Sequence, residues 1–381
     1  MKVAHIVRQY LPSIGGMEEM VRSLAASQRQ GGIISPSIIT LDRVYRELDN
    51  KLPEREMIEG TPVTRISYRG SERYPIAPAV LAAIKNADLV HVHGIDFFYD
   101  FLAATRWLHR KPLVASTHGG FFHTAFASRL KQVYFKTVTR ASSFAYEQVI
   151  ATSAHDGSLF EAIVPSSRLC VIENGVDTQK FAHAASPSTR PVMLYFGRWS
   201  SNKGLLEALQ VFAALQGRQP ETGWKLIIAG RPYDLDQAAL AAQANALGVA
   251  EHIEVFENPS QDQLRTFIGR ASYYICLSHH EGFGIAAVEA LSAGLSPILS
   301  DIPPFRRLAE STGRGLLIDR DRPEAAAQQI LAFVAREAAS GDARQRNADS
   351  VSSYAWQGVE SQYLEAYRRA TGAPKLHPAT R

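Results

Sequence analysis

Residues Ser278–Ser300 read SHHEGFGIAAVEALSAGLSPILS, and the fold prediction rests on their pattern. An apolar strand ends immediately before this stretch, and the polar turn that follows contains Glu281, Gly282 and Gly284. A helix of small residues then ends at Gly294, and a second apolar strand begins directly after it. In such a unit, unpaired backbone N–H groups and the helix dipole point outward together and favour an anion. The pattern therefore predicts a parallel α/β sheet with an anion-binding turn.

Two carboxylates in this stretch indicate a longer ligand. Glu281 and Glu289 are eight residues apart, which corresponds to ~12 Å along a helix and to the reach from sugar to ribose in an extended sugar nucleotide. We expect Glu281 and the backbone N–H groups of Phe283, Gly284 and Ile285 to hold a sugar or phosphate, and Glu289 to accept ribose hydroxyl groups. The alternative is an ordinary capped strand–helix unit in which Glu289 is only solvated.

The composition is that of a folded globular protein. The 381 residues are 46% hydrophobic and 20% charged, with a formal net charge of +4, which fits two domains. No apolar run reaches the roughly 18 residues that a membrane span needs, and the N-terminal sequence lacks the apolar region of a signal peptide. The two cysteines, Cys170 and Cys276, lie in apolar strand patterns and are expected to be buried free thiols. We therefore expect a cytoplasmic protein.

Strands and helices alternate along both halves of the chain. Apolar strand patterns such as Val3–Val7 and Val192–Phe196 are separated by helical stretches, which predicts parallel sheets covered by helices on both faces. The polar segment 174–191 predicts a linker between a domain of residues 1–173 and one of residues 192–353. The expected fold class is α/β, with two Rossmann-like doubly wound domains facing a central cleft, where such sheets bind ligands.

In each half of the chain, the loop after the first strand is a further candidate for anion binding. Gly15 and Gly16 precede a helix, so a phosphate can approach bare backbone there, although a Gly-Gly pair is also an ordinary turn. The loop Gly197–Gly204 places Arg198 and Lys203 around a helix N-terminus. Cations are unfavourable at that position unless an anion lies between them, and a diphosphate fits. Two solvated cations are the alternative.

Three histidines lie on strands of the first half. His118 ends a strand and precedes two glycines, so we predict that it faces the ligand cleft, with a structural histidine as the alternative. His91 and His93 alternate along another strand. No third metal ligand is evident beside them, and core packing or hydrogen bonding is expected.

Asp234 and Asp236 match the D-x-D pattern with which some sugar transferases hold a metal ion. They stand where a helix begins, so helix capping explains them better. No metal is predicted.

A basic, aromatic region extends from Phe101 to Tyr146, with seven Arg or Lys residues and no Asp or Glu. Such a surface attracts anionic lipid head groups or phosphates, and nucleic acid is not expected because no recognised binding module accompanies it. A solvated helix is the alternative. The residues expected to contact a membrane or a lipid-linked acceptor are Phe121, Phe122, Arg129, Lys131, Lys136 and Arg140.

Taken together, these features resemble the retaining glycosyltransferases of family 4, which have the GT-B fold. The resemblance spans nearly the whole chain and rests on Gly15–Glu18, His118, Asn174–Asp177, Gly197–Gly204 and the E-x7-E spacing of Glu281 and Glu289. It implies an acceptor-binding first domain, a nucleotide-sugar-binding second domain, a helix over 354–370 that crosses back to the first domain, and no metal or other cofactor.

The resemblance also implies roles by position. Gly16, Arg198 and Lys203 would hold the diphosphate, Glu281 would contact the donor sugar and Glu289 the ribose, and His118 would lie near the reacting side of the sugar. The predicted donor-binding set is Gly15, Gly16, Arg198, Lys203, Glu281, Gly282, Phe283, Gly284, Ile285 and Glu289. The predicted catalytic groups are His118, Arg198, Lys203 and Glu281.

A narrower resemblance covers residues 13–19, 68–71, 74–78, 93–100 and 117–124. These segments are similar to the GDP-mannose-dependent α-mannosyltransferases of xanthan- and acetan-type exopolysaccharide synthesis. This implies retaining transfer of mannose from GDP-mannose to a polyprenyl-diphosphate-linked cellobiose, by a peripheral protein on the inner face of the cell membrane.

Other activities remain open on the residues alone. A family-4 transferase with another nucleotide sugar and acceptor, or a GT-B nucleotide-sugar 2-epimerase, is the main alternative. A glycoside hydrolase would use carboxylates ~5 to 9.5 Å apart, and the phosphate-directed cations argue against it. A non-catalytic subunit would bind the donor without turnover.

Overall fold

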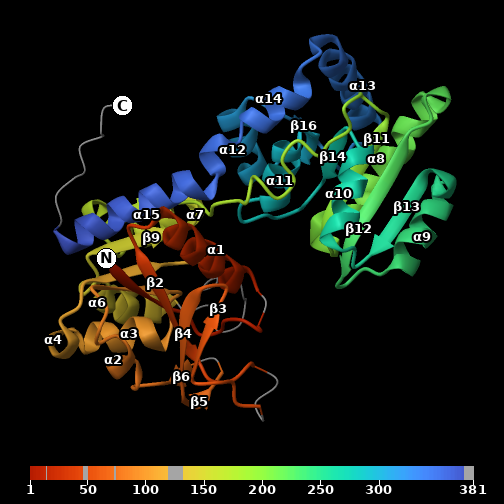
Figure 1. The fold of residues 1–381 in the computed structure, drawn as a ribbon. Helices are drawn as coiled ribbons and strands as arrows, with labels where there is room; N and C mark the ends of the chain where they lie inside the picture. Colours follow the sequence, from red (N-terminus) through yellow and green to blue (C-terminus); the bar gives the residue numbers. More distant parts are fainter. Residues whose placement is uncertain (14, 46–49, 73, 119–131, 373–381) are drawn as a thin grey trace. The chain divides into compact units, whose positions relative to one another are not determined.

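The computed structural model describes residues 1–13, 15–45, 50–72, 74–118 and 132–372. The chain divides into two compact units: unit 1 comprises Met1–Gly175 with Trp356–Arg381, and unit 2 comprises Val176–Ala355. Each unit has its own sheet with helices packed against it (Figure 1). The α/β class expected from the alternating pattern is therefore confirmed in both units.

The sheet of unit 1 has eight strands in the order β10-β9-β8-β7-β1-β2-β4-β3. The strands are β1 (Lys2–Ile6), β2 (Ser35–Leu41), β3 (Arg55–Ile58), β4 (Thr61–Ile66), β7 (Leu89–His93), β8 (Leu113–Ser116), β9 (Gln148–Ala151) and β10 (Leu169–Val171). Pairing is parallel except between β3 and β4. A separate antiparallel hairpin joins β5 (Arg69–Ser71) to β6 (Tyr74–Ile76).

Helices cover both faces of this sheet. On one face α1 (Gly16–Gly31) packs beside α15 (Trp356–Thr371), which brings the last helix of the chain into unit 1 (Figure 1). The buried residues of α1 are Met20, Val21, Leu24, Ala25 and Gln28. Their spacing of three or four residues places them on one face of the helix. On the other face, a second buried core includes residues of α2 (Val80–Ala83), α3 (Phe97–Ala104), a π-helical turn (Phe135–Thr139) and α7 (Ala154–Phe160). Two further short helices of this unit are α4 (Arg106–His109) and α6 (Arg140–Ser143).

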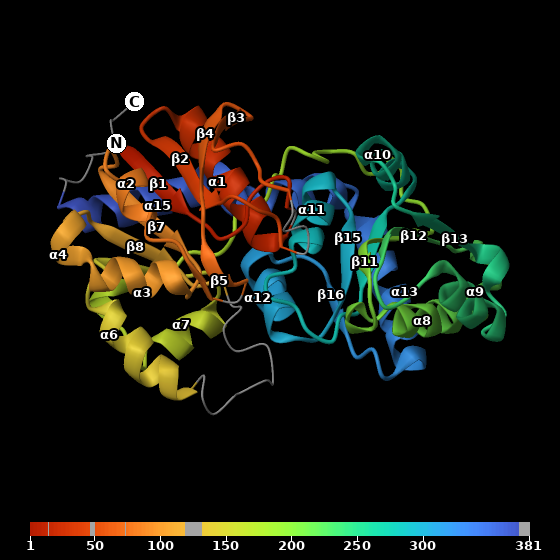
Figure 2. The same cartoon turned by 90° about the horizontal axis from the view of Figure 1, so that it is seen from below.

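The sheet of unit 2 is fully parallel, with the order β13-β12-β11-β14-β15-β16. Its strands are β11 (Val192–Trp199), β12 (Lys225–Pro232), β13 (Ile253–Glu257), β14 (Tyr273–Cys276), β15 (Ser296–Ser300) and β16 (Leu316–Ile318). Its helices are α8 (Leu205–Arg218), α9 (Gln237–Ala246), α10 (Gln261–Arg270), α11 (Ile285–Ala293), α12 (Pro303–Thr312), α13 (Pro323–Ser340) and α14 (Ala343–Asp349). Figure 2 shows α8 and α10 on opposite faces of this sheet.

The chain order of the sheet in unit 2 reverses between β11 and β14. This is the doubly wound arrangement in which a ligand binds outside the carboxyl ends of the strands at the reversal point. The loops after these two strands, Ser200–Gly204 and Leu277–Gly284, both leave from that point. Tertiary structure therefore unites two motifs that are about eighty residues apart in the sequence.

Of the segment 174–191, which was predicted as a linker, residues 176–191 lie within unit 2. Phe181 is fully buried and its ring contacts Phe196 of β11, with ring centroids 6.1 Å apart. The backbone N–H groups of His183 and Ala185 donate to the carbonyls of Ser292 and Ala293. The buried aromatic ring and these hydrogen bonds hold the segment against the core, which its polar composition did not indicate.

Both cysteines are free, as expected. Cys276 is buried, whereas Cys170 is only half-buried because it lies on β10, the edge strand of the sheet in unit 1.

Candidate functional site

The loop after β11 is built to expose its backbone at the reversal point of the sheet. Asp234 accepts hydrogen bonds from the backbone N and the Oγ of Ser201, at 2.8 and 2.9 Å. Gly204 has a left-handed φ of 64°, and a Cβ at this position would lie 2.0 Å from the carbonyl oxygen of Leu277. Only glycine allows this close approach. The sequence therefore places glycine where the loop of β11 meets the loop of β14.

Two hydrogen bonds join the loops directly. The N–H of His279 donates to the carbonyl of Asn202 at 2.8 Å, and Nδ2 of Asn202 donates to the carbonyl of His280 at 2.9 Å. His279 Nε2 also lies 2.7 Å from Glu207 Oε1 on α8. These contacts hold both loops in one arrangement before any ligand arrives.

Lys203 and Glu281, which the sequence assigned to the same ligand, meet each other. Lys203 Nζ lies 2.5 Å from Glu281 Oε1, and the two side chains are only 21% and 12% exposed. Ser278 Oγ donates to the same carboxylate oxygen at 2.9 Å. The ammonium group is thus held by the turn that precedes α11, and the N-terminus of that helix favours an anion.

The turn before α11 also depends on glycine. Gly284 has φ 91°, and a Cβ there would lie 2.7 Å from Cε1 of Phe305. Helix α11 begins at Ile285, so its first N–H groups have no intrahelical acceptor. Phe283 is half-buried and packs against Tyr354, with ring centroids 5.7 Å apart, while Gly282 is exposed.

Glu289 has a partner that was not predicted from the sequence. Lys180 Nζ lies 2.9 Å from Glu289 Oε1, with side chains 33% and 13% exposed. Asp177 shapes this segment, because its Oδ1 accepts from the N–H groups of Gln179 and Lys180 at 3.1 Å each. The Asn-Gly-Val-Asp motif therefore positions Lys180, and only the folded chain reveals this.

Two further cations, Arg198 and Arg320, lie near these loops. Arg198 is exposed and its Cζ lies 4.7 Å above the ring of Tyr233. Arg320, which follows β16, donates to the carbonyl of Ser278 at 3.3 Å. Arg320 was not among the predicted residues, since an isolated arginine after a short strand carries no sequence signal.

The two aspartates of the D-x-D pattern have structural roles. Asp236 caps α9 by accepting from the N–H of Ala239 at 2.8 Å, and Asp234 holds Ser201 as described above. The prediction that Asp236 caps a helix is confirmed.

In unit 1, Gly15 and Gly16 stand at the N-terminus of α1. A Cβ on Gly15 would lie 2.4 Å from Oε2 of Glu18, whereas a Cβ on Gly16 would meet nothing within 4 Å. Gly16 is exposed, so this helix end offers the bare backbone that an anion can approach.

His118 follows β8 and is the end of a buried hydrogen-bonded network. Its Nε2 lies 2.9 Å from Nδ1 of His93, and Nε2 of His93 lies 3.0 Å from Nδ1 of His5. The network continues from His5 Nε2 to Oε1 of Gln28 at 2.8 Å, and from Nε2 of Gln28 to the hydroxyl of Tyr367 at 3.2 Å. Burial lowers the pKa of His5 and of His118 to about 4, so both rings are neutral near pH 7.

His5 supplies the third ligand that was not evident beside His91 and His93. One ring nitrogen from each lies within 4.8 Å of the others, a spacing that could hold a metal ion. Each of their ring nitrogens, however, already lies within hydrogen-bond distance of a protein group. The described geometry is that of the expected hydrogen-bonded core, with His5 added from the neighbouring strand.

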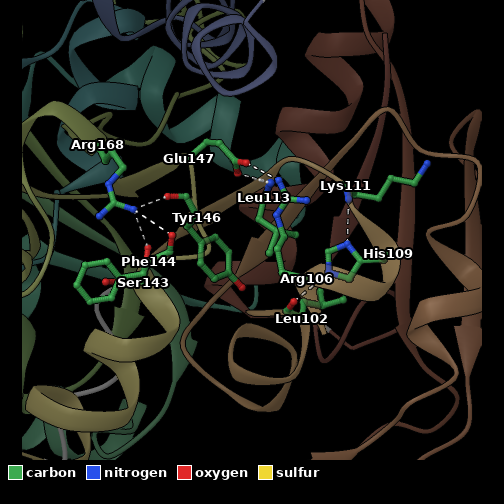
Figure 3. A network of polar contacts seen from close by, with 10 residues as sticks. All are labelled: Leu102, Arg106, His109, Lys111, Leu113, Ser143, Phe144, Tyr146, Glu147 and Arg168. Atoms are coloured by element: carbon green, nitrogen blue, oxygen red, sulfur yellow. Dashed lines mark hydrogen bonds and ion pairs between the residues drawn. The ribbon is translucent and has the colours of Figure 1, made fainter. Parts of the chain in front are cut away.

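Exposed apolar side chains lie along the basic region of unit 1. Trp107 and Leu108 of α4 are 75% and 56% exposed, and Phe144 is 65% exposed. Polar contacts hold these segments together (Figure 3): Arg106 pairs with Glu147 at 2.6 Å, and Arg168 donates to the carbonyls of Ser143, Phe144 and Tyr146 at 3.2–3.3 Å. Lys136 and Arg140 are exposed on the neighbouring helical turns. Phe121, Phe122, Arg129 and Lys131 lie outside the described residues.

Among the described residues, no helix combines the length and the apolarity needed to cross a membrane.

Two family profiles match the chain. Residues 14–180 match Glycosyltransferase Family 4, and residues 176–349 match Glycosyl transferases group 1. The division between the two matches falls close to the boundary between units 1 and 2.

Similar proteins share the full length of the chain. GDP-mannose:cellobiosyl-diphosphopolyprenol alpha-mannosyltransferase of Xanthomonas campestris is 52% identical over 382 residues, which covers 100% of both chains. The protein of the same name from Komagataeibacter xylinus is 44% identical over 98% of this chain and 94% of its own length. Among solved structures, a glycosyltransferase of Rickettsia africae superposes with a TM-score of 0.72 over 97% of this chain and 98% of its own, at 18% identity.

Proposed function

Because the chain belongs to glycosyltransferase family 4 and has the GT-B fold, we propose that it transfers mannose from GDP-mannose to a polyprenyl-diphosphate-linked cellobiose, with retention at the anomeric carbon. The observation that carries this proposal is the full-length identity of 52% to the GDP-mannose:cellobiosyl-diphosphopolyprenol alpha-mannosyltransferase of Xanthomonas campestris. The geometry at the carboxyl ends of β11 and β14 supports it, because an ammonium group and a helix N-terminus converge there.

The donor is held mainly by unit 2 in this proposal. Its diphosphate lies at the N-terminus of α11, where Lys203 and Arg198 neutralise its charge. Glu281 contacts the mannose and Glu289 accepts the ribose hydroxyl groups. Lys203 and Lys180, which pair with these carboxylates in the structure, keep the two negative charges compensated before the donor binds.

The bond that breaks joins the anomeric carbon of mannose to the β-phosphate oxygen of GDP. GDP leaves with the bonding electron pair, and Lys203, Arg198 and the helix amides stabilise the negative charge that develops on it. An acceptor hydroxyl forms the new bond on the same face of the sugar, and its proton passes to the departing phosphate oxygen. In this proposal Lys203 and Arg198, rather than a metal ion, supply the positive charge, and Asp234 and Asp236 make structural hydrogen bonds.

Unit 1 binds the lipid-linked acceptor, with His118 near the reacting side of the sugar. The exposed Trp107, Leu108 and Phe144, with Lys136 and Arg140 nearby, touch the inner face of the cell membrane in this proposal. Apolar side chains enter the membrane interface. Cations attract anionic head groups, and this attraction contributes about 1 kcal/mol of binding free energy for each Lys or Arg near the surface.

Vesicle sedimentation tests the membrane contact. A Trp107→Ser, Phe144→Ser variant should bind phosphatidylglycerol vesicles more weakly than the native protein. Met57→Ser, which replaces a side chain that is 64% exposed on β3, should bind them normally. Equal binding by all three proteins would contradict the proposed contact.

A donor panel tests the activity itself. The protein should transfer mannose from GDP-mannose to a lipid-linked cellobiose and should use UDP- and ADP-sugars poorly. Incubation with donor alone separates a transferase from a nucleotide-sugar 2-epimerase, because only the epimerase changes the donor without an acceptor. Efficient transfer from a UDP-sugar, or turnover of the donor alone, would overturn the assignment.

A further inference from the structure

The histidine network of unit 1 connects His118 to helices at both ends of the chain sequence. His118, His93 and His5 lie on or directly after three strands, Gln28 lies on α1 and Tyr367 on α15. A second branch runs from the hydroxyl of Tyr367 to Nδ1 of His91, and from Nε2 of His91 to Oγ of Ser116, both at 2.8 Å. Gln28, which is fully buried, is the point where the two branches meet.

Each neutral imidazole carries one N–H and one lone pair, so neighbouring rings in a chain must agree on the direction of donation. The amide oxygen of Gln28 faces His5, so His5 donates from Nε2 and its Nδ1 is an acceptor. His93 then donates from Nε2 to His5, and its Nδ1 accepts from His118. His118 therefore carries its proton on Nε2, and Nδ1 is left as a lone pair.

The second branch is consistent with the same amide orientation. The NH₂ group of Gln28 donates to Tyr367, the hydroxyl of Tyr367 donates to Nδ1 of His91, and Nε2 of His91 donates to Ser116. On the first branch, reversing the proton of His5 or of His93 alone would leave a buried N–H facing another N–H, and reversing that of His118 would leave two lone pairs facing each other, which is costly. The other satisfied arrangement of the first branch reverses all of its bonds together with a flip of the Gln28 amide, whereas the hydroxyl groups of Tyr367 and Ser116 can donate or accept and so accommodate either tautomer of His91.

We propose that Gln28 is a positioning residue that sets the tautomer of His118, so that Nδ1 accepts a hydrogen bond from a hydroxyl group of the substrate. His118 has only this ring nitrogen outside the network, since Nε2 is used by His93. Burial keeps His5 and His118 neutral, which the proton order requires. The inference deepens the proposed function, because it gives His118 an acceptor atom toward a sugar hydroxyl.

Substitution of Gln28 by methionine should reverse the first branch. Without the amide, His5 Nε2 would be a buried N–H with no acceptor, and buried N–H groups without a partner are rarely tolerated. The proton of His5 would move to Nδ1, His93 would donate to His118, and His118 would carry its proton on Nδ1. His5→Leu removes the hydrogen-bond partner of His93 Nε2 and should produce the same change at His118.

The tautomer can be read by nitrogen NMR of protein labelled with ¹⁵N-histidine, with His118 assigned from the spectrum of His118→Gln. The native protein without substrate should show an unprotonated Nδ1 and a protonated Nε2 at His118. Gln28→Met and His5→Leu should exchange these two signals, and Val21→Ala, which perturbs packing on the same buried face of α1, should not. A protonated Nδ1 in the native protein, or unchanged signals in a folded Gln28→Met protein, would overturn the proposal.

Two further measurements separate this proposal from its rivals. In the mannosyl-transfer assay, kcat/KM of Gln28→Met should be about tenfold lower, the effect of one lost neutral hydrogen bond, and Val21→Ala should be normal. If the NMR result is as expected but GDP-mannose is not a donor, the proposed function fails and the tautomer assignment stands. Stoichiometric zinc in the purified native protein, lost in His5→Leu, would instead identify a metal centre and overturn the network.

Discussion

Replacing Lys203 by methionine is the sharpest test of the proposed donor site. The substitution keeps an unbranched side chain of similar length and removes the ammonium group that lies 2.5 Å from Glu281 Oε1. Two consequences follow, one for stability and one for turnover, and the structure predicts that they can be separated.

The stability effect arises because Glu281 is only 12% exposed and keeps only the hydroxyl of Ser278 as a described polar partner. Removing one member of a fully buried ion pair costs about 3–5 kcal/mol, and an exposed pair is worth about 0–1 kcal/mol. For this partly exposed pair we expect a loss of about 1–3 kcal/mol in the free energy of unfolding. Glu281→Gln in the same protein should recover most of that loss, because it removes the uncompensated charge.

The effect on turnover should not be recovered. Loss of a cation that stabilises the departing diphosphate should lower kcat/KM for GDP-mannose by about 10²- to 10³-fold, and the double variant, which also alters the proposed mannose contact of Glu281, should be at least as slow. Urea unfolding measures the first effect and initial-rate kinetics with lipid-linked cellobiose the second. Normal kcat/KM in Lys203→Met would refute the role of this side chain.

Arg218→Met is a matched control for this experiment. Arg218 pairs with Glu324 at 3.0 Å, but the two side chains are 40% and 70% exposed. Its loss should change the free energy of unfolding by less than about 1 kcal/mol and leave the kinetics unchanged.

Three other outcomes are expected. Glu289→Gln should weaken GDP binding about 10- to 100-fold in calorimetry, because charged hydrogen bonds to the ribose are lost; unaltered affinity would argue against ribose contact. Gly284→Ala should lower the free energy of unfolding by about 1–3 kcal/mol in urea titrations, because φ is 91° and a Cβ would meet Phe305; a neutral effect would contradict the strain argument. Burial lowers the pKa of His5 from 6.5 to about 4. As the pH falls from 6.5 to about 4, His5 therefore binds a proton in the unfolded chain before it does so in the folded protein. Over this pH range the free energy of unfolding should decrease by roughly 3 kcal/mol. Urea unfolding that is independent of pH over this window would refute that linkage.

Much of the proposed donor site is marked by local signals in the sequence. The spacing of Glu281 and Glu289, the glycines of the turn before α11, and the cations after β11 are each contained in a few consecutive residues. Local chain geometry restricts such positions strongly, since a left-handed φ or a close backbone approach admits little but glycine. The packing of residues 176–191 within the predicted linker could not be read locally for the opposite reason, because it depends on Phe181 meeting distant residues of unit 2.

The amino-acid sequence by itself determined the class of fold, the family and the residue types at the carboxyl ends of the strands, because periodicity, glycine placement and short-range spacing are properties of neighbouring residues. Only the tertiary structure decided which side chains share a site. It paired Lys180 with Glu289 across 109 positions and Lys203 with Glu281 across 78. It also joined His118 to Tyr367 through His93, His5 and Gln28. These contacts depend on strand order and on which helix covers which face, and no local pattern encodes either.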